Sequence, residues 1–285
     1  MSGLPIDRAA IERAAALVAG ADALVVAAGA GMGVDSGLPD FRGDAGFWQA
    51  YPALAAGGTA FADIASPAAF HADPRRAWGF YGHRLALYRA TAPHAGFGML
   101  WRWGQALAHG AFVHTSNVDG HFQRAGFDPL RIEECHGSIH HLQCMLPCSD
   151  MRWSAAALAP AVDAAACRWL GPLPACPHCG GLARPGILMF DDTAWLDGRS
   201  AAQALRRQRW LETVRRPVVV EIGAGTAVPA VRRFARRVVQ QHGGALVRIN
   251  PRDADPGGLP GVGIAGQALP VLAAIDALLH PDASR

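Results

Sequence analysis

Lysine is absent from the sequence, so all 26 basic residues are arginine, set against 23 acidic residues. The resulting net charge of +3 is too small to predict binding to nucleic acid. Long apolar runs are also lacking, because the stretch from 23 to 34 is shorter than the roughly 20 residues of a membrane helix. Charged side chains at Asp7, Arg8 and Glu12 interrupt any signal-peptide core. We therefore expect a cytoplasmic protein that binds neither a membrane nor a nucleic acid.

The chain has 285 residues, of which 51% are hydrophobic and 17% charged, enough to bury a sizeable core. Segments with apolar residues at helical spacing alternate with short apolar runs, as in a parallel sheet covered by helices. Asp73-Pro74 predicts the capped start of a helix. The patterns predict helices over 6–19, 74–89 and 267–279, an arginine-rich helix after Ala227, and strands over 23–28, 112–115, 131–134, 187–190, 217–222 and 245–249.

This order of elements predicts an α/β fold, a Rossmann-like parallel sheet domain that carries two excursions. One excursion is rich in Cys, Pro and Gly, unlike the segments on either side of it. We predict a Rossmann-like, nucleotide-binding domain from residues 1–44, 93–143 and 181–285, a helical insertion at 45–92 and a small cysteine-rich module at 144–180. The cleft between the domain and its excursions is the expected ligand site.

Six cysteines are present, and in a reducing compartment cysteine pairs indicate metal binding before disulfides. Cys144-x3-Cys148 and Cys176-x2-Cys179 have the form of a four-cysteine zinc ribbon, in which the thiolates close a tetrahedron with no open position. The alternative is that these cysteines are small buried apolar residues. The other two cysteines fit neither pair.

A glycine-rich turn follows the first predicted strand. Gly29-Ala30-Gly31-Met32-Gly33 lets backbone N–H groups approach phosphate oxygens, although such a turn alone is as often purely structural. The residues that continue it, from 35 to 43, read Asp-Ser-Gly-Leu-Pro-Asp-Phe-Arg-Gly and resemble the NAD-binding signature of the sirtuins, the NAD-dependent protein deacylases. Further segments resemble sirtuin motifs in chain order, at 115–120 with 123–126, at 136–138, at 184–185 with 190, at 223–230 and at 249–250.

The resemblance implies an enzyme that uses NAD to deacylate acyl-lysine proteins or peptides. In sirtuins the acyl oxygen attacks the ribose C1′ as nicotinamide leaves, a histidine then deprotonates a ribose hydroxyl, and water yields lysine and O-acyl-ADP-ribose. His136 and Asn117 are the expected catalytic residues, although a structural histidine and a turn-capping asparagine fit the same positions. The expected NAD-binding residues are Gly29, Ala30, Gly31, Asp40, Phe41, Arg42, Ser116, Asn117, Asp119, Gly223, Gly225 and Asn250.

Tyr81-x-x-Arg84 lies in the helix predicted over 74–89, where a spacing of three places both side chains on one face. Sirtuins that prefer negatively charged acyl groups carry a similar pair. The resemblance therefore implies succinyl- or malonyl-lysine as the preferred substrate, because a guanidinium and a phenol can bind an acyl carboxylate. A solvated arginine beside a core tyrosine gives the same pattern.

Several positions near the expected cofactor depart from the sirtuin pattern, and most of them lack a hydroxyl group that would hydrogen-bond NAD. They are Ala28, Gly33, Ser116, Asp191, Ala224 and Gly225. Mono-ADP-ribosyl transfer or NAD hydrolysis on the same fold is therefore an alternative activity, and NAD or ADP-ribose sensing is a third role. The presence of both Asn117 and His136 favours catalysis.

Overall fold

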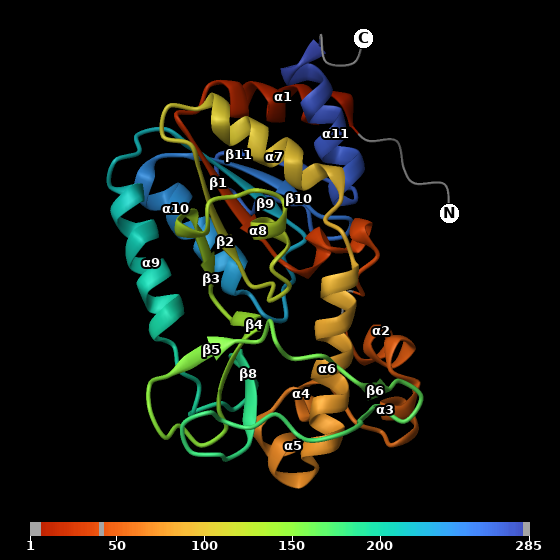
Figure 1. Ribbon diagram of the computed structural model, residues 1–285. Helices are drawn as coiled ribbons and strands as arrows, with labels where there is room; N and C mark the ends of the chain where they lie inside the picture. Colours follow the sequence, from red (N-terminus) through yellow and green to blue (C-terminus); the bar gives the residue numbers. More distant parts are fainter. Residues whose placement is uncertain (1–6, 40–42, 282–285) are drawn as a thin grey trace.

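A parallel sheet of six strands forms the centre of the protein in the computed structural model, which describes residues 7–39 and 43–281 (Figure 1). The strands are β1 (Ala23–Ala28), β2 (Ala111–Thr115), β3 (Ile132–Glu134), β9 (Pro217–Ile222), β10 (Ala245–Ile249) and β11 (Gly261–Ile264). Their order is β11-β10-β9-β1-β2-β3, which is that of a doubly wound dinucleotide-binding sheet. The predicted α/β fold is confirmed, and the two halves of the sheet diverge between β1 and β9.

Helices cover both faces of this sheet because both faces are apolar. All six residues of β1 are buried, and successive side chains point to opposite faces. The even-numbered residues of β1 share a core with α1, α7 and α11, and the odd-numbered residues share one with α9 and α10. These helices are α1 (Arg8–Ala19), α7 (Ala95–Ala106), α9 (Gly198–Leu211), α10 (Ala230–His242) and α11 (Ala268–Leu279). None of the helices in the described ranges combines the length and apolar character needed to cross a membrane.

The lower half of Figure 1 holds short helices and two small sheets. They share one apolar core, in which Trp78 and Trp169 lie with ring centroids 5.5 Å apart. The three-stranded sheet has the order β5-β4-β8, and β6 pairs with β7. The elements are α2 (Gly43–Ala50), α3 (Pro52–Ala56), α4 (Phe61–Ile64), α5 (Pro67–Ala72), α6 (Pro74–Ala90), β4 (Gly137–Cys144), β5 (Arg152–Ser154), β6 (Val162–Asp163), β7 (Arg168–Trp169) and β8 (Ala183–Ile187). Short turns of helix complete the chain at η1 (Ala30–Met32), η2 (Val34–Ser36), α8 (His121–Arg124) and η3 (Pro129–Arg131).

Helix α6 begins where the sequence predicts it. The Asp73 carboxylate accepts hydrogen bonds from the backbone N–H groups of Arg75 and Arg76, both at 3.1 Å, and Pro74 occupies the first helical position. The cap satisfies two of the N–H groups that a helix start leaves without partners. Because the cap sets the residue at which α6 begins, it also sets which face of the helix carries the two expected acyl-binding residues.

The predicted strand over 187–190 is wrong. Strand β8 ends at Ile187, and the chain then leaves the sheet. The Leu188 N–H donates to the His136 carbonyl at 3.0 Å, and the Phe190 N–H donates to the Ala65 carbonyl at 2.9 Å. Of this apolar run, Ile187 and Met189 are buried in the second core, whereas Leu188 and Phe190 are partly exposed and line a cavity.

Candidate active site

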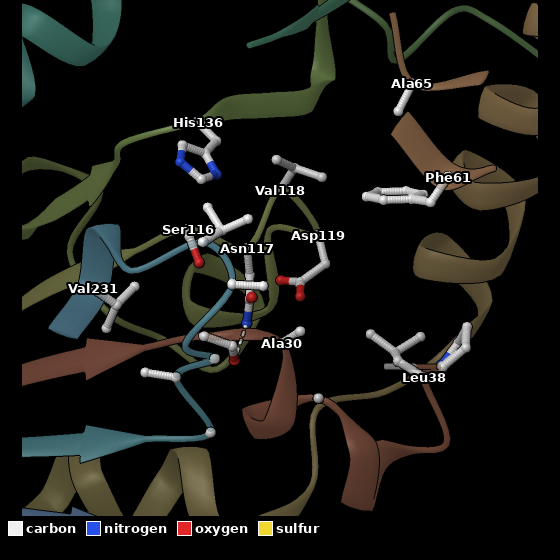
Figure 2. A pocket seen from close by; sticks show the side chains of 18 of the residues that line it. Ala30, Leu38, Phe61, Ala65, Ser116, Asn117, Val118, Asp119, His136 and Val231 are labelled. Carbon is white, nitrogen blue, oxygen red and sulfur yellow. Dashed lines mark hydrogen bonds between the residues drawn. The ribbon is translucent and has the colours of Figure 1, made fainter. Parts of the chain in front are cut away.

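A cavity of about 590 Å³ opens at the carboxyl ends of the central strands, between the large sheet and the second core. Its lining comes from the turns that follow β1, β2, β3, β8, β9 and β10 and from α4 and α6. Figure 2 shows His136, Asn117 and Asp119 on one side of the cavity and Leu38 and Phe61 on the other. Doubly wound sheets bind their ligands at this edge.

Most of the predicted site residues meet in this cavity. Gly29, Ala30, Tyr81, Arg84, Ser116, Asn117, Asp119, His136, Gly223, Gly225 and Asn250 line it. Gly31 is placed differently, because it packs behind the lining and its N–H donates to the Gly223 carbonyl at 3.1 Å. The predicted Asp40, Phe41 and Arg42 lie outside the described residues.

The loops after β1 and β9 touch backbone to backbone. A Cβ atom on Gly29 would lie 2.7 Å from the Gly223 carbonyl oxygen. A Cβ atom on Gly223, whose φ is +60°, would lie 2.4 Å from the Gly31 Cα. Only glycine fits such an approach. The two loops therefore present peptide groups without side chains at the point where the sheet divides, a surface that fits the phosphates of a dinucleotide.

Asn117 and Asp119 are held by hydrogen bonds at the end of β2. Asn117 Nδ2 donates to the Gly29 carbonyl at 3.0 Å, and Asp119 Oδ1 accepts from the His121 N–H at 2.9 Å. Burial raises the pKa of Asp119. Asn117 thus ties the ends of β1 and β2 together, and both side chains face the cavity at fixed positions (Figure 2).

His136 follows β3 and faces the same cavity. Burial lowers the pKa of His136, the neighbouring His114 lowers it further, and a hydrogen bond to the Ser116 carbonyl opposes both effects. The imidazole is therefore neutral at physiological pH and can accept a proton.

A buried network behind the cavity was not foreseen from the sequence. The parallel register pairs His114 with Glu133, and His114 Nδ1 lies 2.9 Å from Glu133 Oε2. Arg207 of α9 donates to the same carboxylate, and the His114 ring stacks on Phe234 of α10 with centroids 3.9 Å apart. No local pattern marks these residues, because strand register and helix packing bring them together. The network joins β2 and the edge strand β3 to α9 and α10.

The segment after β8 is held by a fully buried ion pair between Arg184 and Asp192. The Asp192 carboxylate also accepts from the backbone N–H groups of Met189 (3.2 Å) and Ala194 (3.1 Å). Asp191 has a φ of +54°, a left-handed conformation that aspartate tolerates better than most residues. The left-handed conformation explains how aspartate can stand at position 191, where sirtuins usually have glycine. The contacts of Asp192 fix the position of residues 188–190, which form one wall of the cavity.

The four predicted zinc ligands meet at the far end of the small sheet. The Sγ atoms of Cys144 and Cys179 are 3.6 Å apart, those of Cys148 and Cys176 are 3.7 Å apart, and all four lie within 4.8 Å of one another. Four thiolates at the usual Zn–S distance stand about 3.8 Å apart in a tetrahedron. Burial opposes ionisation, but backbone N–H groups of Cys179 and His178 hold the pKa of Cys176 at about 7. The tetrad therefore fits a structural zinc ion.

His94 anchors the first glycine loop from outside the cavity. Its Nδ1 accepts from the Gly96 N–H at 3.0 Å and caps α7, and its Nε2 donates to the Met32 carbonyl at 2.9 Å. Burial lowers the pKa of His94, as it does for His114 and His136. These contacts require a neutral ring.

The free energy of unfolding is expected to fall as the pH drops below about 6.5, the ordinary pKa of histidine. The unfolded chain then binds protons that the folded chain excludes, and each such histidine contributes up to about 1.4 kcal/mol per pH unit. The variant His94→Asn keeps a capping side chain without a titrating ring and is expected to reduce this slope. Urea unfolding at pH 7.5, 6.5 and 5.5 measures both slopes, and equal slopes would contradict the assignment.

The fold and the cavity define a Rossmann-like protein of the dinucleotide-binding class. Comparison with known proteins identifies the family within this class. The sequence profile of the Sir2 family matches residues 29–214. The chain is 33% identical to NAD-dependent protein deacylase 1 of Pseudomonas aeruginosa, over 90% of this chain and 95% of the relative. It is 32% identical to the NAD-dependent protein deacetylase of Shouchella clausii, over 83% and 85%. A solved Sir2 homologue–NAD complex matches with a TM-score of 0.71 at 24% identity, over 99% and 96%. The chain belongs to the Sir2 family.

Proposed function

We propose that the protein is an NAD-dependent lysine deacylase that releases nicotinamide and transfers the acyl group to ADP-ribose. The observation that carries this proposal is one cavity that joins the facing glycine loops, the neutral imidazole of His136 and the Tyr81–Arg84 pair. The activities named for the relatives from P. aeruginosa and S. clausii support the same reaction. Acyl-lysine proteins or peptides are the corresponding substrates.

In this proposal the loops at Gly29 and Gly223 hold the phosphates, and Asn117 and Asp119 hold the ribose and nicotinamide end. Bound NAD supplies the ribose carbon and hydroxyl groups to which the acyl group moves. His136 takes the proton from the attacking hydroxyl. Asn250 positions the loop that follows β9, because its Nδ2 donates to the Ala224 carbonyl at 3.0 Å. Its Oδ1 accepts hydrogen bonds from two backbone N–H groups. In this proposal the apolar side chains that line the cavity, Leu38 and Phe61 among them, exclude water and so favour acyl transfer over loss of the reactive sugar.

The preferred acyl group in this proposal carries a carboxylate. Tyr81 and Arg84 lie on one face of α6, are buried, and line the cavity, which supports an acyl-binding role for Arg84 over that of a solvated arginine. A guanidinium and a phenol in this setting suit succinyl or malonyl groups.

Arg84→Gln is expected to lower kcat/KM for a succinyl-lysine peptide about 10- to 150-fold, because hydrogen bonds to a charged group contribute about 1.5–3 kcal/mol. The acetyl-lysine peptide of the same sequence should change by less than about threefold. Arg84→Lys, which keeps the charge but loses the planar fork, should be intermediate. Equal losses on both peptides would contradict the acidic-acyl preference.

Nicotinamide release with and without acylated peptides tests the reaction class. Deacylation requires release that depends on peptide, together with O-acyl-ADP-ribose in the mass spectrum. Release without any acyl peptide would instead indicate NAD hydrolysis, and a protein product heavier by one ADP-ribosyl group would indicate mono-ADP-ribosyl transfer.

A further inference from the structure

A second tyrosine, Tyr88, lies on the face of α6 that carries Tyr81 and Arg84. It follows Arg84 by four positions, one helical turn, and it lines the same cavity. Tyr88 is 6% exposed and Arg84 is 8% exposed. No motif in the sequence distinguishes Tyr88 from an ordinary core residue, so its contacts decide its role.

Tyr88 fixes the direction of the Arg84 guanidinium. Arg84 Nε and Nη2 both donate to Tyr88 Oη, at 2.9 and 2.7 Å. The guanidinium carbon also lies 5.3 Å from the Tyr88 ring centroid, 5.2 Å from that of Phe80 and 5.9 Å from that of Tyr81. A forked hydrogen bond together with three aromatic rings restricts the guanidinium to one orientation.

The same contacts determine what the Tyr88 hydroxyl can still do. A phenolic oxygen accepts through its lone pairs and donates through one O–H. Both N–H groups of Arg84 point at the oxygen, so further bonding must use the hydroxyl hydrogen. Within residues 7–39 and 43–281 no acceptor receives a bond from it. Burial raises the pKa of Tyr88, Arg84 opposes this rise, and Asp119 adds to it, so the phenol keeps its proton.

We propose that Tyr88 is a specificity-determining residue, which orients Arg84 and donates its own O–H to the carboxylate of an acidic acyl group. The inference rests on the proposed deacylase function and on its preference for acidic acyl groups. An apolar acyl chain of the same size offers no acceptor, so the buried hydroxyl would stay without a partner and the site would reject that chain.

The test compares Tyr88→Phe with the wild-type protein on two peptides of one sequence. One carries succinyl-lysine, and the other carries 4-methylpentanoyl-lysine, in which two methyl groups replace the carboxylate oxygens. Tyr88→Phe is expected to lower kcat/KM for the succinyl peptide about 10-fold or more, chiefly through KM, and to leave the apolar peptide within about twofold. The ring, and with it the cation–π contact, is retained.

Tyr51→Phe is the matched control. Tyr51 belongs to the same aromatic cluster, but its hydroxyl lies 3.0 Å from His83 Nδ1 and it does not line the cavity. This variant removes an equivalent buried hydroxyl and should leave the ratio of the two kcat/KM values unchanged. Thermal unfolding of both variants reports their effect on stability.

The outcomes separate the inference from the proposals beneath it. A wild-type protein that neither binds nor turns over the succinyl peptide in preference to the apolar one would overturn the acidic-acyl preference and this inference together. A wild-type preference that Tyr88→Phe preserves would overturn only the role of Tyr88. Equal losses on both peptides, with a lower unfolding temperature, would make Tyr88 purely structural. No peptide-dependent nicotinamide release or binding at all would overturn the deacylase function as well.

Discussion

Replacement of His136 by alanine is expected to slow acyl transfer by about 10²- to 10⁴-fold, the usual contribution of a general base. The imidazole faces the cavity at the end of β3, and burial together with His114 lowers its pKa, so the base is neutral at physiological pH. In our proposal Asn117 and Asp119 hold the end of NAD from which nicotinamide leaves, and the substitution keeps both residues in place. A slow loss of NAD should therefore persist in His136→Ala while O-acyl-ADP-ribose disappears.

Mass spectrometry of both products over time measures the two steps separately. His71→Ala, which removes an exposed histidine in the last turn of α5, is the control and should behave as wild type. The wild-type rate should fall on the acid side at a pH below about 6.5, because the pKa of His136 is lowered. Formation of O-acyl-ADP-ribose by His136→Ala at the wild-type rate would remove this residue from the mechanism.

Removal of zinc is expected to abolish most of the activity and to lower the unfolding temperature, since structural zinc sites contribute directly to folding. The reason for the loss of activity is the path of the chain. Strand β4 begins directly after His136 and ends at Cys144, while β8 starts soon after Cys179 and leads into 188–190. The tetrad therefore holds one end of a paired sheet whose other end carries the base and a wall of the cavity.

Metal analysis, activity and thermal unfolding with and without a chelator measure this effect. Cys176→Ser should reproduce the chelated state, and added zinc should restore only the wild-type protein. His178→Ala is the matched control, because its Nδ1 lies 3.4 Å from Cys148 Sγ although it is outside the tetrad. Full activity and an unchanged unfolding temperature after chelation would show that the tetrad holds no structural metal.

The parts of the fold that the sequence predicts are those with strong local signals. The strands at 23–28, 217–222 and 245–249 have the predicted bounds, because each is a short and mainly apolar run between polar or glycine residues. Strand β11 (Gly261–Ile264) escapes prediction, since half of it is glycine and it forms by pairing with β10. The run at 187–190 shows the opposite error, as its apolar residues line a cavity.

In the candidate site, too, local motifs predict some residues, and tertiary packing alone brings the others together. Motif resemblance located the residues that follow β1, β2, β3 and β9, because those turns are short and their order along the chain is fixed. Arg207 and Glu133 are 74 positions apart, so their contact depends on how α9 packs. Tyr88 lies within four positions of Arg84, yet its role depends on the rotamers of both side chains and on the cavity beside them. Such relations arise only in the folded chain.

The buried ion pair of Arg184 and Asp192 affects the free energy of ligand binding in the cavity. Ordering a loop on association lowers affinity, since freedom lost by the loop opposes binding. Here the carboxylate, two backbone N–H groups and the guanidinium already set the course of 188–190, and the Phe190 N–H is tied to the Ala65 carbonyl. This wall of the cavity is preorganised, so in the proposed function a peptide would meet a fixed surface there and its rate of binding would depend on collision and fit.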